Sequence, residues 1–287
     1  MFARHRRLIA SLIVVVLALV GGYAWVMIHG AALLAAPRDK GPGWTAPAAE
    51  MADPGAVTRG EHLATVTACG VCHGQDMAGH RQMLGGSPFH APNLTLAARR
   101  LSDADFERAL RRGVTRDGRS EVVMPSFAYA ALTDAETADL LAYLRSLPAK
   151  GTAQPLTQPG FGARWNLVIG RYPLQADRVA HVTPPVEAGP ALAQGRHLAQ
   201  VACGQCHGAD LAGGKALPGP DITLAGYYDR AAFHRLLRTG DGRTEHDLGV
   251  MALTARSNFS HFSDPEIDAI YDYLIQRDRL LLAGTKK

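Results

Sequence analysis

The sequence is poor in cysteine, with four in 287 residues, and its share of charged residues, 20%, is somewhat low for a globular protein. No Ser-His-Asp set, glycine-rich nucleotide loop or pair of carboxylates stands out, which argues against chemistry on a bound substrate. A long alternation of apolar and polar residues is also lacking, so an extensive β-sheet is not expected. Of the formal net charge of +4, three come from Arg4, Arg6 and Arg7, and nothing favours nucleic acid as a partner.

The four cysteines form two copies of one motif, Cys-x-x-Cys-His. Two thiols at this spacing on a helical turn can add across the vinyl groups of one porphyrin, and the adjacent imidazole then reaches the iron. Each copy is therefore predicted to attach one haem c, so two covalently bound haems are expected. The predicted attachment residues are Cys69, Cys72 and His73 in the first copy, and Cys203, Cys206 and His207 in the second.

Two other uses of a Cys-x-x-Cys pair are a redox dithiol and half of a zinc site. A zinc site would need four ligands in a tetrahedral cage, whereas the two pairs lie in separate repeats that each supply an adjacent His. With all four thiols in thioether bonds, none remains for a disulfide. An oxidising compartment is then inferred from the haem motif and not from cystines.

The N-terminal region is predicted to be a membrane anchor. Residues 1–7 are basic, and residues 8–28 form a run of 21 residues without a charge, which is enough to cross a hydrocarbon core of about 30 Å. Basic residues before this run and few after it place the N-terminus in the cytoplasm and the rest in the periplasm. The alternative is a signal peptide cleaved within residues 30–36. The length of the run and Trp25 near its outer end favour an uncleaved anchor in the bacterial inner membrane.

The remainder of the chain contains an internal repeat. The segment Gly60-Glu61-His62-Leu63-Ala64 before the first motif corresponds to Gly195-Arg196-His197-Leu198-Ala199 before the second. After the motifs, Pro92-Asn93-Leu94-Thr95-Leu96 corresponds to Pro220-Asp221-Ile222-Thr223-Leu224. Each half is predicted to contain a helix, a haem-binding turn, loops, a middle helix and a terminal helix.

Helix signals recur at matching positions of the two halves. Residues 106–113 and 233–240 have apolar side chains at helical spacing and end on a glycine suited to a C-cap. Thr133 with Glu136, and Ser263 with Glu266, are capping signals at the start of the terminal helices.

The predicted fold class is mainly α, with two tandem repeats of one domain after one transmembrane helix. The linker between the halves is rich in proline and is expected to be an ordered strap with polyproline segments. The predicted organisation is an anchor at 1–30, a Pro/Gly/Ala tether at 31–51, a first domain at 52–150, a linker at 151–188 and a second domain at 189–287.

These segments resemble the class I cytochrome c family over nearly all of residues 51–287. More narrowly, Ala91 to Thr95, Leu101 to Val114 and Ala142 to Pro148 look like the cytochrome c subunits of membrane-bound periplasmic dehydrogenases. Those subunits commonly carry three Cys-x-x-Cys-His motifs and a membrane segment at the C-terminal end, whereas this chain has two motifs and an N-terminal apolar run. The resemblance implies that the first helix of each domain crosses the last helix at a glycine. The matching pairs are Gly60 with Tyr143 and Gly195 with Tyr273.

The sixth iron ligand decides between an electron carrier and a catalyst, because a Met ligand closes the iron to small molecules. In the first domain Met124, which lies 51 residues after His73 and directly before a proline, matches the family pattern for this ligand. In the second domain Met251 is the only Met after the motif, and His261 and His246 are competitors. The alternative for either Met is apolar core packing.

Pro92 and Pro220 resemble the family's proline that packs beside the proximal imidazole and presents its backbone carbonyl region to the ring N–H. The alternative is a simple turn proline.

The predicted function is a membrane-anchored dihaem electron relay. It would accept electrons from a dehydrogenase or quinol-oxidising complex and pass them to a terminal oxidase or another cytochrome, without being an enzyme itself. One alternative is a dihaem peroxidase, which needs an open sixth site at one iron. The other is a haem-bearing subunit that anchors a dehydrogenase to the membrane.

Overall fold

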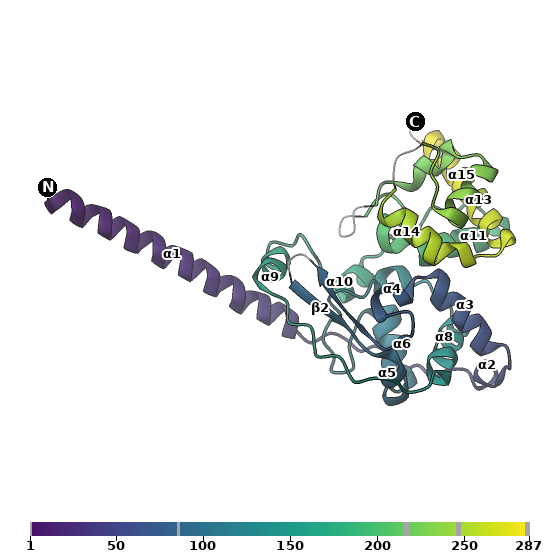
Figure 1. Cartoon of the computed structure of the whole chain (residues 1–287), viewed down its shortest axis with the longest axis horizontal. Coiled ribbons are helices and arrows are strands. Elements are labelled where there is room, and N and C mark those ends of the chain that lie inside the picture. Colours follow the sequence, from purple (N-terminus) through teal and green to yellow (C-terminus); the bar gives the residue numbers. More distant parts are fainter. Residues whose placement is uncertain (1, 85–86, 215–218, 245–247, 285–287) are drawn as a thin grey trace.

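The computed structural model describes residues 2–84, 87–214, 219–244 and 248–284. A long N-terminal helix, α1, precedes two helical domains that are joined by a linker with two helices (Figure 1). The first domain contains α2 (Ala48–Ala52), α3 (Ala56–Val66), α4 (Cys69–His73), β1 (His80–Leu84), β2 (Ser87–Ala91), α5 (Leu94–Arg100), α6 (Asp103–Arg112), α7 (Ser126–Tyr129) and α8 (Asp134–Ser146). The linker contains α9 (Phe161–Val168) and α10 (Gln175–Ala180). The second domain contains η1 (Pro190–Leu192), α11 (Ala193–Leu198), η2 (Ala199–Cys203), α12 (Gly204–His207), η3 (Ile222–Tyr227), α13 (Arg230–Thr239), α14 (Val250–Ser257), η4 (Phe259–His261) and α15 (Asp264–Gly284).

Helix α1 (Phe2–Ala35) projects away from both domains along most of its length (Figure 1). Among the described residues it is the one helix that is long and apolar enough to cross a membrane, and its apolar side chains are exposed. The helix continues to Ala35, beyond the anchor boundary expected at residue 30. Only its last turns contact the rest of the molecule, where α9 packs beside it.

The first and last helices of each domain cross at a glycine, as the family resemblance implied. A Cβ atom on Gly60 would lie 2.0 Å from the carbonyl oxygen of Asp139 and 2.8 Å from the Cβ of Tyr143. On Gly195 it would lie 1.9 Å from the carbonyl oxygen of Ala269. Only glycine therefore allows α3 to pack on α8, and α11 on α15, at these separations.

The predicted helix caps are present. Gly113 and Gly240 follow α6 and α13 in the left-handed conformation, with φ of 64° and 77°, which a residue with a side chain adopts only at a cost. At the start of α8, Thr133 and Glu136 form a reciprocal capping box. Ser263 and Glu266 are hydrogen bonded in the same position before α15.

Two features of the chain were not predicted. Strands β1 and β2 form an antiparallel hairpin in the first domain, because the chain from His73 to Pro92 is six residues longer than the chain from His207 to Pro220. The linker contains helices α9 and α10, where the sequence indicated extended polyproline segments.

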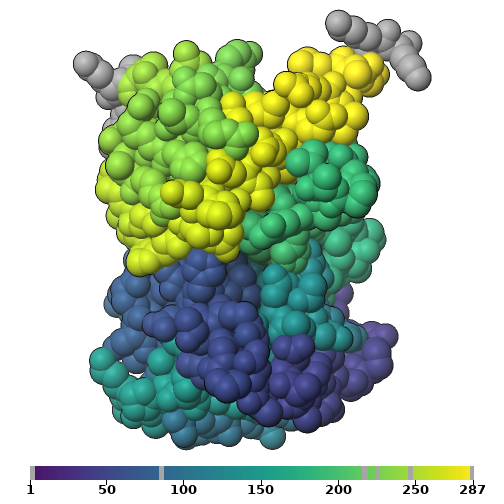
Figure 2. All heavy atoms as spheres, turned by 90° about the vertical axis from the view of Figure 1, so that its right-hand side faces the viewer, coloured from purple at the N-terminus to yellow at the C-terminus, as the bar shows by residue number. Residues whose placement is uncertain are grey.

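The two domains pack against each other over a broad face (Figure 2), and buried side chains from both form one hydrophobic core. At the edge of this core, His62 Nε2 of α3 lies 2.9 Å from Glu266 Oε1 of α15. Reciprocally, His197 Nε2 of α11 lies 2.7 Å from Glu136 Oε1 of α8. Because equivalent residues of the two repeats pair with each other in both directions, the interface has approximate two-fold symmetry.

Candidate functional site

The first Cys-x-x-Cys-His motif forms the single helical turn α4. Ala68 before it has a left-handed backbone, with φ of 58°, and Gly74 after it has φ of 80°, so the turn is set off from α3 by a sharp bend. The Nδ1 atom of His73 lies 2.9 Å from the carbonyl oxygen of Pro92. Since a carbonyl can only accept, Nδ1 carries the proton and Nε2 keeps a lone pair for a metal.

The second motif repeats this arrangement with a different entry. The chain between Gly195 and Cys203 is one residue shorter than the chain between Gly60 and Cys69. It passes from α11 through the π-helical segment η2 directly into the motif. The Nδ1 atom of His207 lies 2.8 Å from the carbonyl oxygen of Pro220. The main-chain hydrogen bond that closes the loop after the His is also the same in both domains, from Gly79 to His73 and from Gly213 to His207, each 2.8 Å.

A cavity of about 430 Å³ adjoins the first motif. Cys69, Cys72 and His73 line one side of it, and Met124 lines it from the loop between α6 and α7. The structure thus brings together all the residues that the sequence proposed for one haem. The remaining walls combine apolar residues with segments from outside the domain, including Leu34 of α1.

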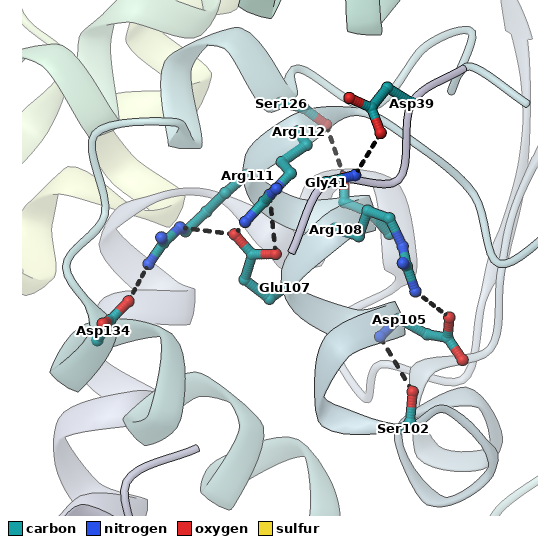
Figure 3. A network of polar contacts seen from close by, with 11 residues as sticks. Asp39, Gly41, Ser102, Asp105, Glu107, Arg108, Arg111, Arg112, Ser126 and Asp134 are labelled. Atoms are coloured by element: carbon teal, nitrogen blue, oxygen red, sulfur yellow. Dashed lines mark hydrogen bonds and ion pairs between the residues drawn. The ribbon is translucent and has the colours of Figure 1, made fainter. Parts of the chain in front are cut away.

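The loop that carries Met124 is held from both of its sides. Ser126 Oγ donates to the carbonyl oxygen of Ala109 on α6 at 2.8 Å, next to a buried network in which Glu107 pairs with Arg111 and Arg112 (Figure 3). The linker contributes as well, because the backbone N–H of Gln175 at the start of α10 donates to the carbonyl oxygen of Glu121 at 3.1 Å. These bonds hold the chain on both sides of Met124 in place.

In the second domain the candidate sixth ligands lie in different settings. Met251 stands in the first turn of α14, half-buried, and packs on the same core as Cys203. His261 is exposed in η4, and its position therefore does not favour it over Met251. His246 lies outside the described residues.

The protonation behaviour of the motifs argues against a redox dithiol. Burial raises the pKa of all four cysteine thiols, that of Cys203 to about 12, whereas a redox dithiol depends on a lowered pKa. Burial also lowers the pKa of His73, although the hydrogen bond to Pro92 opposes this, so the imidazole stays neutral as a ligand must. Within the described part of the chain, no three His, Cys, Asp or Glu side chains group so as to hold a metal ion, which speaks against the zinc alternative.

Three residues that the sequence did not single out connect the two motifs. Gln205, inside the second motif, donates from Nε2 to the carbonyl oxygen of Thr67 at 2.8 Å, and Thr67 lies two residues before Cys69. The buried hydroxyl of Tyr129 donates to the same carbonyl at 3.1 Å. Cys72 and Cys206 are close enough to interact electrostatically. The one feature of the sequence that could have indicated this contact is the polar residue Gln205, at the position where the first motif has Val71.

One further ionisable group lines the first cavity. Burial, with a smaller contribution from the charge of Asp117, raises the pKa of Glu121 to about 7. Arg119 lines the same wall of the cavity.

Comparison with known proteins finds two family matches. Residues 57–148 match the family "Cytochrome c", and residues 190–274 match "Cytochrome C oxidase, cbb3-type, subunit III". The two matches lie on the two domains that the repeat defined.

The curated relatives include three cytochrome subunits. The gluconate 2-dehydrogenase cytochrome c subunit of Pantoea cypripedii is 27% identical over 273 residues, covering 78% of this chain and 60% of that protein. The fructose dehydrogenase cytochrome subunit of Gluconobacter japonicus is 25% identical, covering 80% and 54%. The cytochrome c subunit of the alcohol dehydrogenase (quinone) of Gluconacetobacter polyoxogenes is 26% identical, covering 78% and 56%. The chain therefore spans only about half to three fifths of the length of these relatives.

Proposed function

Since the chain is a c-type cytochrome with two cytochrome c domains, similar to the cytochrome c subunits of dehydrogenases, we propose that it is a membrane-anchored dihaem electron relay. One haem is attached at Cys69 and Cys72 with His73 as ligand, and the other at Cys203 and Cys206 with His207. Bound haem iron supplies one-electron chemistry. The protein supplies the attachment, the axial ligands, the insulation and the docking faces.

The proposal assigns Met124 and Met251 as the sixth ligands. Met124 supports this because it lines the same cavity as its motif on a loop fixed by Ser126 and Gln175. A Met on each iron would leave no open position for peroxide, which disfavours the peroxidase alternative. Pro92 and Pro220 act through the imidazoles, because their carbonyl oxygens fix which ring nitrogen faces the iron.

The observation that carries the relay is a hydrogen bond between the domains, from the second motif to the chain just before the first motif. Gln205 reaches across the domain interface to the main chain at Thr67, which lies two residues before Cys69, and Gln205 itself directly precedes Cys206. Because each cysteine would hold a porphyrin edge, this contact brings the two attachment edges together. Electrons can then pass between the domains inside one chain, without an encounter between two proteins.

The donor and acceptor are part of the same proposal. The chain would receive electrons from a dehydrogenase, as a subunit of its complex, or from a quinol-oxidising complex, and deliver them to a terminal oxidase or another cytochrome. The long apolar α1 helix would hold it in the bacterial inner membrane with both domains in the periplasm.

The inter-motif contact is tested with Gln205→Val, which installs the residue that the first motif carries at 71. The matched control is Gln82→Val, since Gln82 also donates to the main chain of a motif, at Val71, but within its own domain. After rapid reduction of one haem, we expect electron equilibration between the haems to slow several-fold in Gln205→Val and to stay unchanged in the control. Equal equilibration rates in the two variants would show that the hydrogen bond of Gln205 does not contribute to electron transfer between the haems.

The peroxidase alternative is tested with the ferric protein and cyanide. The relay predicts that neither haem binds cyanide rapidly, because a Met occupies each sixth position. Rapid binding at one haem would favour the peroxidase alternative.

A further inference from the structure

Helix α9 of the linker carries an apolar stripe on its outer side. It consists of Phe161 and Trp165 and of Ile169, the residue directly after the helix. At the spacing i, i+4 and i+8, these side chains are exposed at 41%, 44% and 50%. Residues at this spacing lie on one face of a helix. The ring centroids of Phe161 and Trp165 lie 6.4 Å apart. Two neighbouring exposed aromatic rings are unusual on a surface that contacts only water.

This helix is fixed to the end of the apolar helix α1. The ring of Phe161 stacks on Tyr23 with centroids 5.2 Å apart and the planes within 9°. Arg164 Nη1 donates to the carbonyl oxygen of Met27 at 3.0 Å, and Gly30 leaves room for the stem of the same arginine. Figure 1 shows α9 beside the last turns of α1, on the flank of the first domain where α1 meets it.

The contact occurs at a defined depth along α1. The run that contains neither a charged residue nor a His ends at Ile28, and at 1.5 Å per residue Tyr23 lies about 8 Å inside this end. Helices that lie in a membrane interface bury their apolar face about 5–10 Å below the headgroup boundary. Trp25, which is 49% exposed at the same level, is a residue typical of the interfacial belt.

We propose that α9 lies in the outer interface of the lipid bilayer, with Phe161, Trp165 and Ile169 in contact with lipid. The inference rests on the proposed membrane anchoring by α1 and adds a second lipid contact to it. It commits to a lipid surface as the partner, because the stripe is continuous through Tyr23 with the helix that crosses the membrane.

This contact would set the position of the first haem. The other side of α9, at Ala163 and Leu167, borders an apolar cavity of about 250 Å³. Val122 and Val123, directly before Met124, form the facing wall of this cavity. The axial loop of the first domain is thus separated from the lipid contact by one helix.

The experiment uses the full chain in lipid nanodiscs with spin labels on single introduced cysteines. The proposed thioether bonds occupy all native thiols, so the introduced cysteine is the only free one. Labels are placed by Trp165→Cys, by Ile169→Cys as a second stripe position, by Leu17→Cys within the span, and by Leu253→Cys. Leu253, 60% exposed in the second domain, is the matched apolar control. Collisions with oxygen and with a water-soluble nickel chelate are measured on the reduced protein.

We expect labels at 165 and 169 to collide several-fold less with the chelate, and more with oxygen, than the label at 253. Chelate access at 165 and 169 equal to that at 253, with the label at 17 in lipid, would overturn the inference and leave the anchor intact. A label at 17 that is also accessible to the chelate would overturn the anchor, and this inference with it. An absorption spectrum that keeps the sulfur-to-iron bands of the wild type shows that each labelled variant is folded.

Discussion

The two cytochrome domains share one fold but differ in what surrounds their motifs. The first crevice is closed by Leu34 of α1, by Pro159 and Arg164 of the linker, and by Gln205 of the second domain. In the second domain, helix α14 beside the motif leaves Val250 exposed at 74%. A duplicated domain can thus serve two positions in a relay. The crevice of the first copy is enclosed by segments from outside its own domain, including the end of α1.

The strongest way to break this comparison is to change the sixth ligand in one domain at a time. In Met124→His and Met251→His, we expect the sulfur-to-iron charge-transfer band of the altered haem to disappear and its reduction potential to fall, while the other haem keeps its band. The ferric absorption spectrum and a redox titration report both effects. A Met251→His variant that keeps both bands would show that Met251 is not a ligand and would direct attention to His261 and His246.

The glycine crossings test what the two domains have in common. In Gly60→Ala and Gly195→Ala the added Cβ would lie about 2 Å from backbone carbonyl oxygens that cannot move alone, so each variant should lose roughly 3 kcal/mol of unfolding free energy or fail to fold. Gly43→Ala, where nothing lies within 4 Å, is the control and should stay near the wild type. Denaturant unfolding measures the loss. A loss in only one domain would show that the two crossings are not equivalent.

The smallest expected effect concerns the reciprocal His–Glu pairs between the domains. The hydrogen bond with Glu266 raises the pKa of His62 above its ordinary value of 6.5. Burial favours a higher pKa for Glu266, but the bonds from His62 and Ser263 outweigh it and lower the pKa below its ordinary 4.5. Burial also favours a higher pKa for Glu136, but the hydrogen bond from His197 outweighs it and lowers the pKa below its ordinary value.

The sign of the pH dependence follows from these directions. A raised His pKa gives stability that is complete below pH 6.5 and is lost as the pH rises through the folded value. A lowered Glu pKa gives stability that is complete above pH 4.5 and is lost as the pH falls through the folded value. The interface should therefore be most stable between these limits. The His62–Glu266 pair should add only about 0.5–1 kcal/mol to the free energy of unfolding, because it is partly exposed.

The measurement is denaturant unfolding as a function of pH for the wild type and His62→Gln. In the wild type the free energy of unfolding should decline as the pH rises above 6.5, and the variant should lack the part of this decline that His62 contributes. A wild-type profile with no decline between pH 6.5 and 8 would contradict the assigned role of the pair.

The sequence predicted the repeated features of the fold and could not predict how the copies meet. The motifs, the cap at Gly113 and the capping box at Thr133 depend on neighbouring residues, and the family resemblance supplied the crossing at Gly60. Contacts such as that of His62 with Glu266, 204 residues apart, depend on the docking of two folded domains. The helix at Phe161–Val168 was missed because flanking prolines dominate the local pattern, while packing on α1 decides its conformation.

The central claim is that two porphyrins are attached to this chain through its four cysteines. Pyridine haemochrome analysis of the purified, denatured protein counts covalently held haem directly. The account predicts two haems per chain in the wild type, and one in each of the variants that carry Ser in place of Cys69 and Cys72 or of Cys203 and Cys206. Fewer than two covalent haems per wild-type chain would contradict it.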